Sequence, residues 1–412
     1  MTELASQLVV LTLALTLIAG PSGQSACQEN EGLFLPPLAP EGFGARSIGG
    51  QDGQVIHVTS LADDGPGSLR EALVTPGPRI IRFRVGGTIA LAGPLVVRAN
   101  GRVTIDGASA AEHGGITLTE YGLEFEDCDD VIVTHVRQRR ARMDDGADGG
   151  CFGLLRCNRV LFDHCSGAWS TDENFGAFRV TDVTYQWCIS AEGLIEGGHP
   201  KGPHSMGMIL HRAQGVTIHH CLFASNVARN PRWKGNWGLP WGGEDPSPDL
   251  PTGLDGQGAR IYPLFDIRNN VFFNYVSGGY VDFVPHTNFV GNTYMAGPST
   301  PGGAAELTIG GPDETHGWGR FYVHDNLGPH RGGVDLDEWA LVKVAGQREF
   351  GSIPEVRADS PFEVPLVETQ SAGQAAAEVL QQVGAWPRDA TDRRVMDDVR
   401  LGRGKAGHKG SP

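Results

Sequence analysis

A long stretch near the middle of the chain combines cationic and imidazole side chains without any carboxylate. Between Glu196 and Glu244 there are five Lys or Arg residues and five His residues, but no Asp or Glu. The whole chain carries a formal net charge of -15, so this local composition opposes the global one. Local fields decide what a site binds, and the stretch therefore predicts a site for an anionic ligand. Its cations are Lys201, Arg212, Arg229, Arg232 and Lys234.

Eight short segments share a pattern that could position these side chains. Each has alternating apolar residues followed by a polar or aromatic pair, which is typical of a short strand. They are VTIDG at 103, VIVTH at 131, VLFDH at 160, VTYQW at 183, VTIHH at 216, FDIRN at 265, NFVGN at 288 and FYVHD at 321. The gaps between starts are 28, 29, 23, 33, 49, 23 and 33 residues.

Repeats of this length indicate a stacked architecture. Helical repeats would need a 3.6-residue period, and a propeller blade needs about four strands in about 40 residues. The shorter gaps leave room for three short strands, which is one coil of a parallel β-helix. We therefore predict an all-β fold, a single-stranded right-handed parallel β-helix with an N-terminal capping helix and a C-terminal helix and tail. The long insertions after 187 and after 220 are expected to carry function.

The chain ends do not follow the repeat. The apolar run LVVLTLALTLIAG has the length of a signal-peptide core and is too short for a membrane span. We expect a signal peptide at 1–26, a linker at 27–41, the β-helix at 42–360, a C-terminal extension packing on it at 361–403 and a disordered tail at 404–412. The protein is then secreted (extracellular or periplasmic) and monomeric, although Cys27 leaves a lipid anchor open. A pI near 5.3 argues against nucleic-acid binding.

Three cysteines fall at the same offset after the strand motif. Cys165, Cys188 and Cys221 each follow the polar pair, and free cysteine is usually buried. We predict a stack of small buried side chains rather than disulfides.

Several longer motifs resemble polysaccharide lyase family 1, the pectate lyases, and in particular its bacterial secreted branch. The resemblance covers residues 42–403 and keeps the family's motif order. The matching stretches are VTSLADDGPGSLREAL, RIIRFRVGGTIAL, VLFDHCSGAWSTDEN, VTYQWCISAEGL, HPKGPHSMG, HHCLFASNVARNPRWKG and RDATDRRVMDDVRLGRG. The resemblance implies cleavage of an acidic polysaccharide, pectate (polygalacturonate), by β-elimination. This reaction removes a weakly acidic proton beside a sugar carboxylate, so cations must stabilise the developing charge.

The resemblance also implies roles for individual residues. Arg229 in ARNPR matches the catalytic arginine that accepts the proton. Lys201 in HPKG matches a lysine that binds the substrate carboxylate. Lys234 takes the position of a basic residue that contacts the sugar chain, and Arg232 assists.

The resemblance further implies a Ca2+ site built from carboxylates. Calcium prefers several oxygen ligands, and Asp172 and Glu173 lie in the segment where the family keeps them. The family commonly has an Asp where this chain has Gly150, and Asp148 is expected to substitute. Asp144 and Asp145 could equally cap a turn in their Gly-rich loop. Cys221 is a second departure, because an asparagine is common there.

Other patterns leave alternatives open. The run RQRRAR at 137–142 is either a solvated patch or an extension of the anion-binding surface. Trp233, Trp237 and Trp241 could stack on sugars or pack the long loop. The alternative functions are a calcium-independent pectin lyase acting on methylated pectin, and a non-catalytic β-helix that binds acidic glycans. A glycoside hydrolase is less well supported, because Asp172 and Glu173 should alternate sides on a strand.

Overall fold

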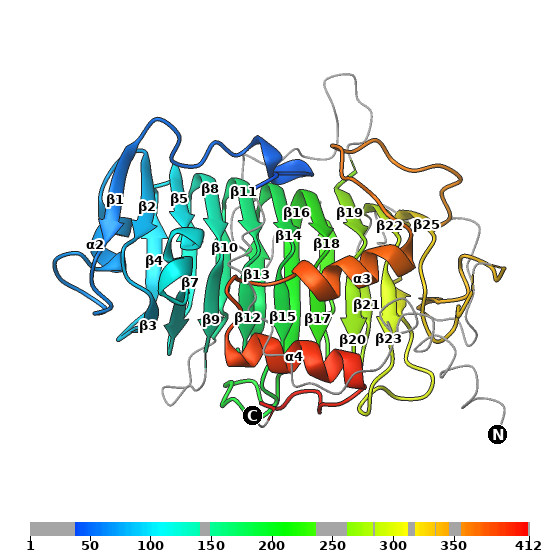
Figure 1. Ribbon diagram of the computed structural model, residues 1–412. Helices are drawn as coiled ribbons and strands as arrows, with labels where there is room; N and C mark the ends of the chain where they lie inside the picture. The colour runs from blue at the N-terminus through cyan, green and yellow to red at the C-terminus, as the bar shows by residue number, and fades with distance from the viewer. Residues whose placement is uncertain are drawn as a thin grey trace, which may run out of the picture.

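Short parallel strands stack into a single coil (Figure 1), and the turns from β2 to β24 each contribute strands to three sheets. This is the right-handed parallel β-helix that the repeat spacing predicted. The computed structural model describes residues 38–140, 149–235, 262–282, 285–311, 318–333, 335–345 and 356–410. Among them, no helix is both long and apolar enough to cross a bilayer.

Sheets A, B and C are each parallel throughout. Sheet A contains β1 (Gln54–Val58), β2 (Arg79–Phe83), β5 (Val103–Asp106), β8 (Asp129–Thr134), β11 (Asn158–Asp163), β14 (Thr181–Gln186), the second half of β16 (Met206–His219), β19 (Leu264–Arg268), β22 (His286–Val290) and β25 (Arg320–His324). Sheet B contains β3 (Gly87–Ala90), β6 (Ile116–Thr119), β9 (Val136–Arg139), β12 (Ser166–Ala168), β15 (Ile189–Ala191), β17 (Leu222–Ala224), β20 (Val271–Phe273) and β23 (Thr293–Met295). Sheet C contains β4 (Leu95–Arg98), β7 (Leu123–Glu126), β10 (Phe152–Leu155), β13 (Glu173–Phe178), the first half of β16, β18 (Arg232–Gly235), β21 (Gly279–Asp282), β24 (Leu307–Ile309) and β26 (Val342–Val344).

All eight sequence motifs lie in sheet A. The first six start at positions that pair in register, namely Val103, Val131, Val160, Val183, Val216 and Phe265. Because the side chains of a strand alternate between faces, the first and third positions of these motifs fill the interior of the coil with apolar groups. The strand pattern was therefore readable from the sequence.

One motif start is displaced by a residue. Phe265 pairs with Thr287 rather than with Asn288, so our start at 288 is wrong by one. Thr287 is fully buried and accepts a hydrogen bond from Trp233 Nε1, which explains how a polar residue occupies an interior position. Asn288 faces the other way and exchanges two hydrogen bonds with the backbone of Phe362.

The predicted cysteine stack is confirmed, and it continues as an asparagine ladder. Cys165, Cys188 and Cys221 are buried free thiols. The amide of Cys165 donates to Cys188 Sγ at 3.4 Å, and that of Cys188 donates to Cys221 Sγ at 3.4 Å. The amide of Cys221 then donates to Asn270 Oδ1 at 2.9 Å, and Asn270 is followed by Asn292 and Asn326 in the same way. Cys221 is therefore the junction between the two ladders.

The N-terminal part of the described chain covers one end and one side of the coil. Ser68 caps α2 (Leu69–Val74) by accepting the amide of Glu71, and the buried face of α2 closes the first coil, as predicted. Before it, η1 (Phe43–Arg46) crosses the outside of sheet A. Gly44 is needed there, because a Cβ would lie 2.3 Å from the carbonyl oxygen of Val160. A further short helix, η2 (Gly107–His113), follows β5.

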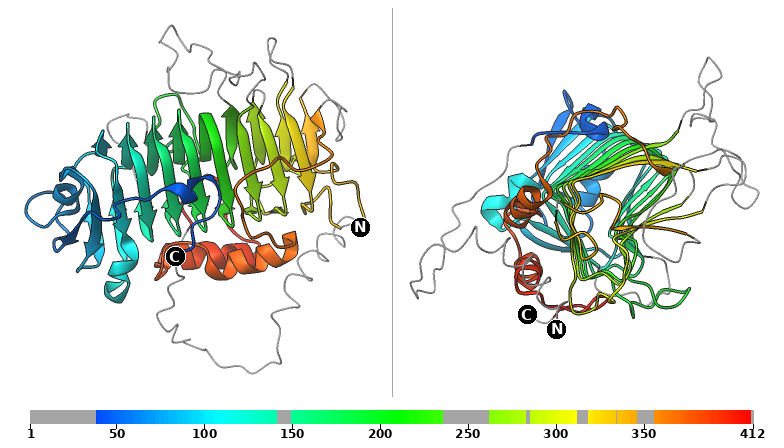
Figure 2. Two further views of the ribbon diagram at one scale, coloured as in Figure 1. Left: turned by 90° about the horizontal axis from the view of Figure 1, so that it is seen from above. Right: turned by 90° about the vertical axis from the view of Figure 1, so that its right-hand side faces the viewer.

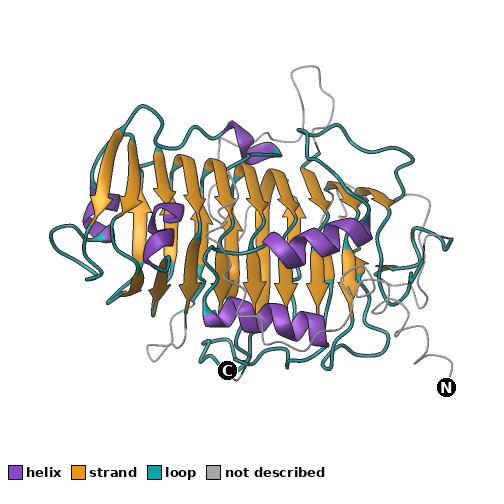
Figure 3. Cartoon of the chain, in the orientation of Figure 1, coloured by secondary structure: helices purple, strands orange, loops and turns teal. Residues whose placement is uncertain are grey.

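The C-terminal extension returns along the outside of the coil. Its helices α3 (Ala372–Gln382) and α4 (Ala390–Leu401) lie on one side, as the end-on view of Figure 2 and the colouring of Figure 3 show. Apolar residues of both helices pack on sheet B, and the contact joins Val379 and Val395 to Ile189, Leu222 and Val271.

Residues 404–410 differ from the disordered tail that we expected. The amide of Gly407 donates to the carbonyl of Ser225 at 2.9 Å, and the carbonyl of Gly407 accepts from Ile195 at 2.8 Å. Gly404 and Gly407 both have positive φ, a conformation that glycine adopts at little cost, and it lets the tail follow the coil surface closely.

Candidate active site on sheet C

Adjacent coils of sheet C bring four of the predicted site residues near one another, namely Glu173, Arg229, Arg232 and Lys234. Strands β13, β16, β18 and β21 are consecutive neighbours. Glu173 pairs with Met206, and Met206 forms a bridge with Ala228, so Glu173 and Arg229 are two coils apart. Neighbouring strands are about 4.8 Å apart, so a long arginine side chain can reach from the Arg229 backbone across the intervening coil to Glu173.

Arg229 lies against two carboxylates, that of Asp172 in the turn before β13 and that of Glu173 at the start of β13. Its Nη1 is 3.6 Å from Asp172 Oδ1 and is in direct contact with Glu173 Oε1. Our expectation that Asp172 and Glu173 point to opposite sides is wrong, because Asp172 lies in the turn before the strand and only Glu173 is in it. Gly207 permits the close approach of the two chains, since a Cβ would lie 2.7 Å from the carbonyl oxygen of Arg229.

The environment of Arg229 disfavours its charged form. The side chain is 21% exposed. Burial lowers the pKa of Arg229 below its ordinary value, the charge of Asp172 opposes this, and the nearby Arg232 lowers it further. A guanidinium with a lowered pKa is a better proton acceptor than a solvated one.

Arg232 and Lys234 share one carboxylate on the next coil. Asp282 Oδ2 is 2.6 Å from Arg232 Nη2 and 3.3 Å from Lys234 Nζ. Arg232 also lies over the ring of Tyr280 at 5.3 Å. Burial lowers the pKa of Lys234, the charge of Asp282 opposes this, and Arg232 lowers it further.

Lys201 belongs to the 193–205 loop, between β15 and β16. It is exposed, and its backbone amide donates to Nδ1 of His199 at 3.1 Å. The Nε2 of that ring lies 3.7 Å from Asp172 Oδ2, and His204 stacks on the ring with centroids 3.7 Å apart. His199 thus connects the turn that carries Lys201 with the carboxylate beside Arg229.

The stretch has no carboxylate in its sequence, but its cations do meet carboxylates in the structure. The carboxylates that meet Arg229, Arg232 and Lys234 among the described residues come from other coils, so the sequence stretch between Glu196 and Glu244 could not reveal them. Asp172 and Glu173 precede the stretch, whereas Asp282 follows it. We missed His199, His204 and Asp282 as site residues. The register of β18 with β21, which pairs Lys234 with Asp282, is the signal that could have identified Asp282.

Among the residues that the structure describes, two groups of ligand atoms could receive a metal ion. Asp172, His199 and His204 offer atoms within 4.8 Å of one another, and so do His135, Asp163 and His164. In the first group, Nδ1 of His199 accepts the Lys201 amide, so the neutral ring carries its proton on Nε2. That tautomer favours a contact with the Asp172 carboxylate over coordination. Asp144, Asp145 and Asp148 lie outside the described residues, as do Trp237 and Trp241. Trp233 is buried in the core, so it packs rather than stacks on sugar.

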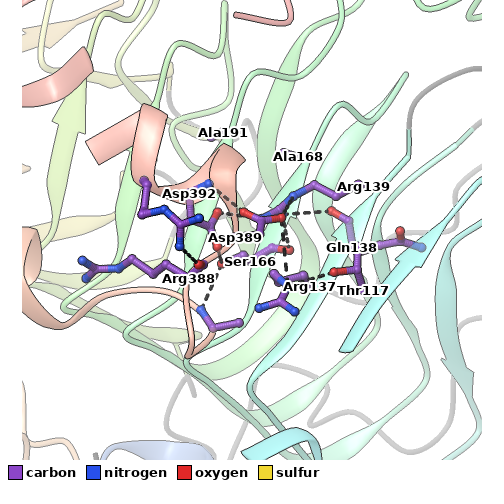
Figure 4. Close-up of polar contacts among 12 residues, drawn as sticks. Thr117, Arg137, Gln138, Arg139, Ser166, Ala168, Ala191, Arg388, Asp389 and Asp392 are labelled. Carbon is purple, nitrogen blue, oxygen red and sulfur yellow. Dashed lines mark hydrogen bonds and ion pairs between the residues drawn. The ribbon is translucent and has the colours of Figure 1, made fainter. Parts of the chain in front are cut away.

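Two arginines of the run at 137–142, Arg137 and Arg139, belong neither to a solvated patch nor to this surface, whereas Arg140 donates to the carbonyl of Gly150 in the turn next to Asp172. Arg137 and Arg139 are buried on sheet B under the C-terminal extension (Figure 4). Arg139 Nη2 is 3.0 Å from Asp389 Oδ1 and 2.7 Å from Asp392 Oδ1. Arg137 Nη2 donates to the carbonyl of Gly114 at 2.7 Å. These arginines hold the extension in place.

The comparisons with known proteins cover nearly the whole chain. Probable pectate lyase C of Aspergillus terreus is 31% identical over 383 residues, which is 91% of this chain and 79% of the relative. The same-named protein of Aspergillus flavus is 34% identical over 382 residues, with 88% and 80% covered. No family model matches the chain.

Solved structures share the fold at low sequence identity. The cedar pollen allergen jun a 1 has a TM-score of 0.56 at 17% identity and covers 84% of this chain and 92% of its own. A pectate lyase from Bacillus sp. N165 in complex with trigalacturonate has a TM-score of 0.50 at 13% identity, with 84% and 99% covered. These likenesses agree with the β-helix. Because the sequence identity to the curated pectate lyases exceeds 30% over most of both chains, the chain belongs to the pectate lyase family.

Proposed function

We propose that the protein cleaves de-esterified pectin, polygalacturonate, by calcium-assisted β-elimination and gives 4,5-unsaturated oligogalacturonides. Membership of the family supports the substrate class, since the curated relatives are named pectate lyases. The observation that carries the proposal is the setting of Arg229, a largely buried guanidinium with a lowered pKa. Lys234 and Arg232 follow it on β18, and His199 connects it through Asp172 to the turn of Lys201.

The reaction needs a base and positive charge in one place. The base removes the proton on C5 of a uronate ring, the electron pair forms the C4=C5 double bond, and the C4–O bond breaks. The leaving oxygen takes a proton from water. Arg229 is the base in this proposal, and Lys201 binds the sugar carboxylate, which lowers the energy of the negative charge that develops on it. Arg232 and Lys234 hold neighbouring acidic sugars.

Glu173 and Asp172 control Arg229 before substrate arrives. Their carboxylates fix the guanidinium by direct contact and at 3.6 Å, which favours its protonated form. Proton transfer to Arg229 therefore requires that these charges be compensated by another cation. Asp172 and Glu173 therefore influence the protonation of Arg229 as well as its position.

The chain offers oxygen ligands that fit calcium. Asp172 Oδ1 is buried and accepts no hydrogen bond from the described residues, and Glu173 lies next to it. Carboxylate oxygens of this kind are preferred by Ca2+, so Asp172 and Glu173 would hold it, with Asp148 as a further candidate. When bound, the ion supplies positive charge that neutralises these carboxylates and the sugar acid.

The proposal predicts a new ultraviolet absorbance from the C4=C5 bond. Purified protein should produce it on polygalacturonate with calcium at alkaline pH, and a chelator should abolish it. Methylated pectin and alginate are tested side by side. Activity on methylated pectin that survives the chelator would instead favour the pectin lyase alternative. That alternative is considered because Gly150 replaces an Asp that is common in the family's calcium site. No absorbance on any polymer, with retained binding, would favour the glycan-binding alternative.

Arg229→Lys tests the assignment of the base. We expect kcat to fall at least about 100-fold, because a general acid or base contributes about 100- to 10,000-fold to the rate. The circular dichroism spectrum should not change. Arg98→Lys is the matched control, because Arg98 also lies on sheet C and pairs with a carboxylate, Glu126. Activity of the Arg229 variant close to that of the control would contradict the assignment.

Export is part of the proposal. The apolar N-terminal run lies outside the described residues, and its sequence supports secretion with removal of a signal peptide at 1–26. Affiliation with the bacterial secreted branch rests on motif order only, because the curated relatives reported above are fungal. The N-terminal sequence of protein recovered from the culture medium tests the cleavage site.

A further inference from the structure

The last described residues of the chain connect two segments of the site. Helix α4 ends at Leu401, and Gly402 caps it in a left-handed conformation. The chain then crosses to the coil, where the amide of Ala406 donates to Ser299 Oγ at 3.0 Å. Gly407 follows, bonded on one side to Ser225 and on the other to Ile195. The tail therefore lies between β17 and the 193–205 loop.

Gly407 fills this space with little to spare. A Cβ at this position would lie 3.0 Å from Ile195 Cβ and 3.0 Å from Val227 Cγ2. Its φ of +81° is also a conformation that other residues adopt at a cost. Val227 comes two residues before Arg229, and Ile195 lies in the loop that carries Lys201. The tail thus packs between the segments of the proposed base and of the proposed carboxylate-binding lysine.

Charged groups fasten the tail on both sides of Gly407. Arg394 of α4 reaches both carboxylate oxygens of Glu192 at 2.7 Å, and Glu192 directly precedes the loop. The same carboxylate accepts Trp169 Nε1 at 2.9 Å and the amide of Gly410 at 3.2 Å. Lys409 Nζ lies 3.8 Å from the centre of the Trp169 ring. The tail is therefore anchored to the start of the loop independently of Gly407.

The other end of the loop is fixed to the Arg229 segment. Ser205 Oγ accepts the amide of Val227 at 3.0 Å, and the amide of Ala228 donates to the carbonyl of Ser205 at 3.0 Å. With both ends held, the loop has few ways to move while the tail is docked. Loss of the tail would release the Ile195 end only.

We propose that residues 404–410 position the 193–205 loop, with Gly407 as the positioning residue, so that Lys201 is presented to the substrate carboxylate beside Arg229. This inference rests on the proposed function. Gly407 does not touch the reacting atoms and acts through Ile195 and the loop. Without the tail, the loop must be ordered each time substrate binds, which weakens binding while the base stays in place. The change should therefore appear in KM more than in kcat.

The test compares the full chain with a truncation after Arg403 and with Gly407→Val. Lys405→Ala is the matched control, because Lys405 is an exposed side chain of the same tail. Three quantities are measured: kcat and KM on polygalacturonate, amide hydrogen exchange of the peptide 194–204, and the melting temperature. For the truncation and for Gly407→Val we expect KM to rise about five- to tenfold, which corresponds to ordering one or two side chains. We expect kcat within about twofold of the full chain and faster exchange in 194–204.

Two results would overturn the inference. One is exchange of 194–204 and KM equal to those of the full chain in both variants. The other is a lowered melting temperature with reduced kcat and unchanged KM, which is the pattern of a purely structural role. If the full chain itself has no lyase activity, the proposed function fails, whereas the exchange measurement still decides whether the tail orders the loop.

Discussion

At Arg229, burial and a neighbouring guanidinium act in the same direction. Both lower the pKa of this residue, and only the carboxylates, with Asp172 foremost, oppose them. The neutral form of Arg229 therefore increases as pH rises towards a pKa below that of a solvated arginine. A base that must be neutral gives an activity that rises with pH through the alkaline range.

Arg232→Gln should shift this alkaline rise to higher pH. The substitution removes a positive charge that lowers the pKa of Arg229 and leaves Asp282, which raises it. The measurement is kcat/KM on polygalacturonate between pH 7 and 11. Arg98→Gln, which removes a charge elsewhere on sheet C, is the control. Coincident profiles for Arg232→Gln and the control would show that the two guanidinium groups are not coupled.

At the scale of single elements, the side-chain ladder in the turns between sheets A and B explains a departure from the family pattern. Cys221 accepts the amide of Cys188, and its thiol points to the carbonyl of Tyr185 at 3.4 Å. In the next coil, Asn270 Nδ2 donates to the carbonyl of Ile218, which is the register partner of Tyr185. Position 221 therefore already has the partners that an asparagine needs.

Cys221→Asn should be tolerated because it extends the asparagine ladder by one coil. We expect the free energy of unfolding to change by less than about 1 kcal/mol, since each new hydrogen bond offsets the burial of a polar group. Cys221→Leu should lower it by about 1–3 kcal/mol through overpacking. Urea unfolding of the two variants gives the comparison, and equal losses would mean that the ladder is not the controlling feature.

Two buried histidines, His220 bonded to Gln370 before α3 and His135 bonded to Trp386 after it, give this part of the fold a defined response to acid. Burial lowers the pKa of His220 to about 4 and that of His135 to about 3. An unfolded histidine titrates near 6.5, so between these values the unfolded state binds protons that the folded state does not. Stability is then lost as pH falls below 6.5.

His220→Gln should reduce the loss of stability between pH 6.5 and pH 4. In this window one histidine can lower the free energy of unfolding by at most about 1.4 kcal/mol per pH unit. Unfolding free energies at several pH values give the slope for the variant and for His113→Gln, an exposed histidine. If the slope of the His220 variant equals that of the control, His220 does not titrate as its burial requires.

At the scale of the whole molecule, the C-terminal extension depends on a buried ion pair. The Arg139 side chain is 3% exposed and that of Asp392 is 1% exposed. Burial favours the neutral form of Asp392 and raises its pKa, although Arg139 opposes this. Removal of the arginine would leave the carboxylate without its cation.

Arg139→Ala should destabilise the protein by about 3–5 kcal/mol and release α4. Limited proteolysis of residues 361–410 and urea unfolding measure the two effects. Arg400→Ala is the control, because Arg400 and its partner Asp397 are both exposed and such pairs contribute little. Protection of the extension in the Arg139 variant would contradict this role.

The fold was predictable because each coil repeats a local signal. The period-two pattern alone predicts the register of Val160, Val183 and Val216. It does not predict that of Thr287, a polar residue whose hydroxyl accepts a hydrogen bond from Trp233 of a neighbouring sheet. Residues of the candidate site could be named from the sequence only where the family motif marks them, as at Arg229 and Lys201, and their roles stay predictions. The contacts of Asp282 and His199 are lateral, between coils, and no local pattern encodes them.

The extension also changes how the solenoid can come apart. It contacts the coil of His135 through Trp386, that of His220 through Gln370 and that of Asp325 through Ala372. Stacked repeats otherwise lose their end units one at a time. Here a single segment contacts several coils, so unfolding of one coil also removes part of the contact that stabilises the others. We therefore expect the coils to unfold together in one concerted transition. Because this segment follows the coils in the sequence, a ribosome-bound chain lacks that fastening until residues 361–403 have emerged.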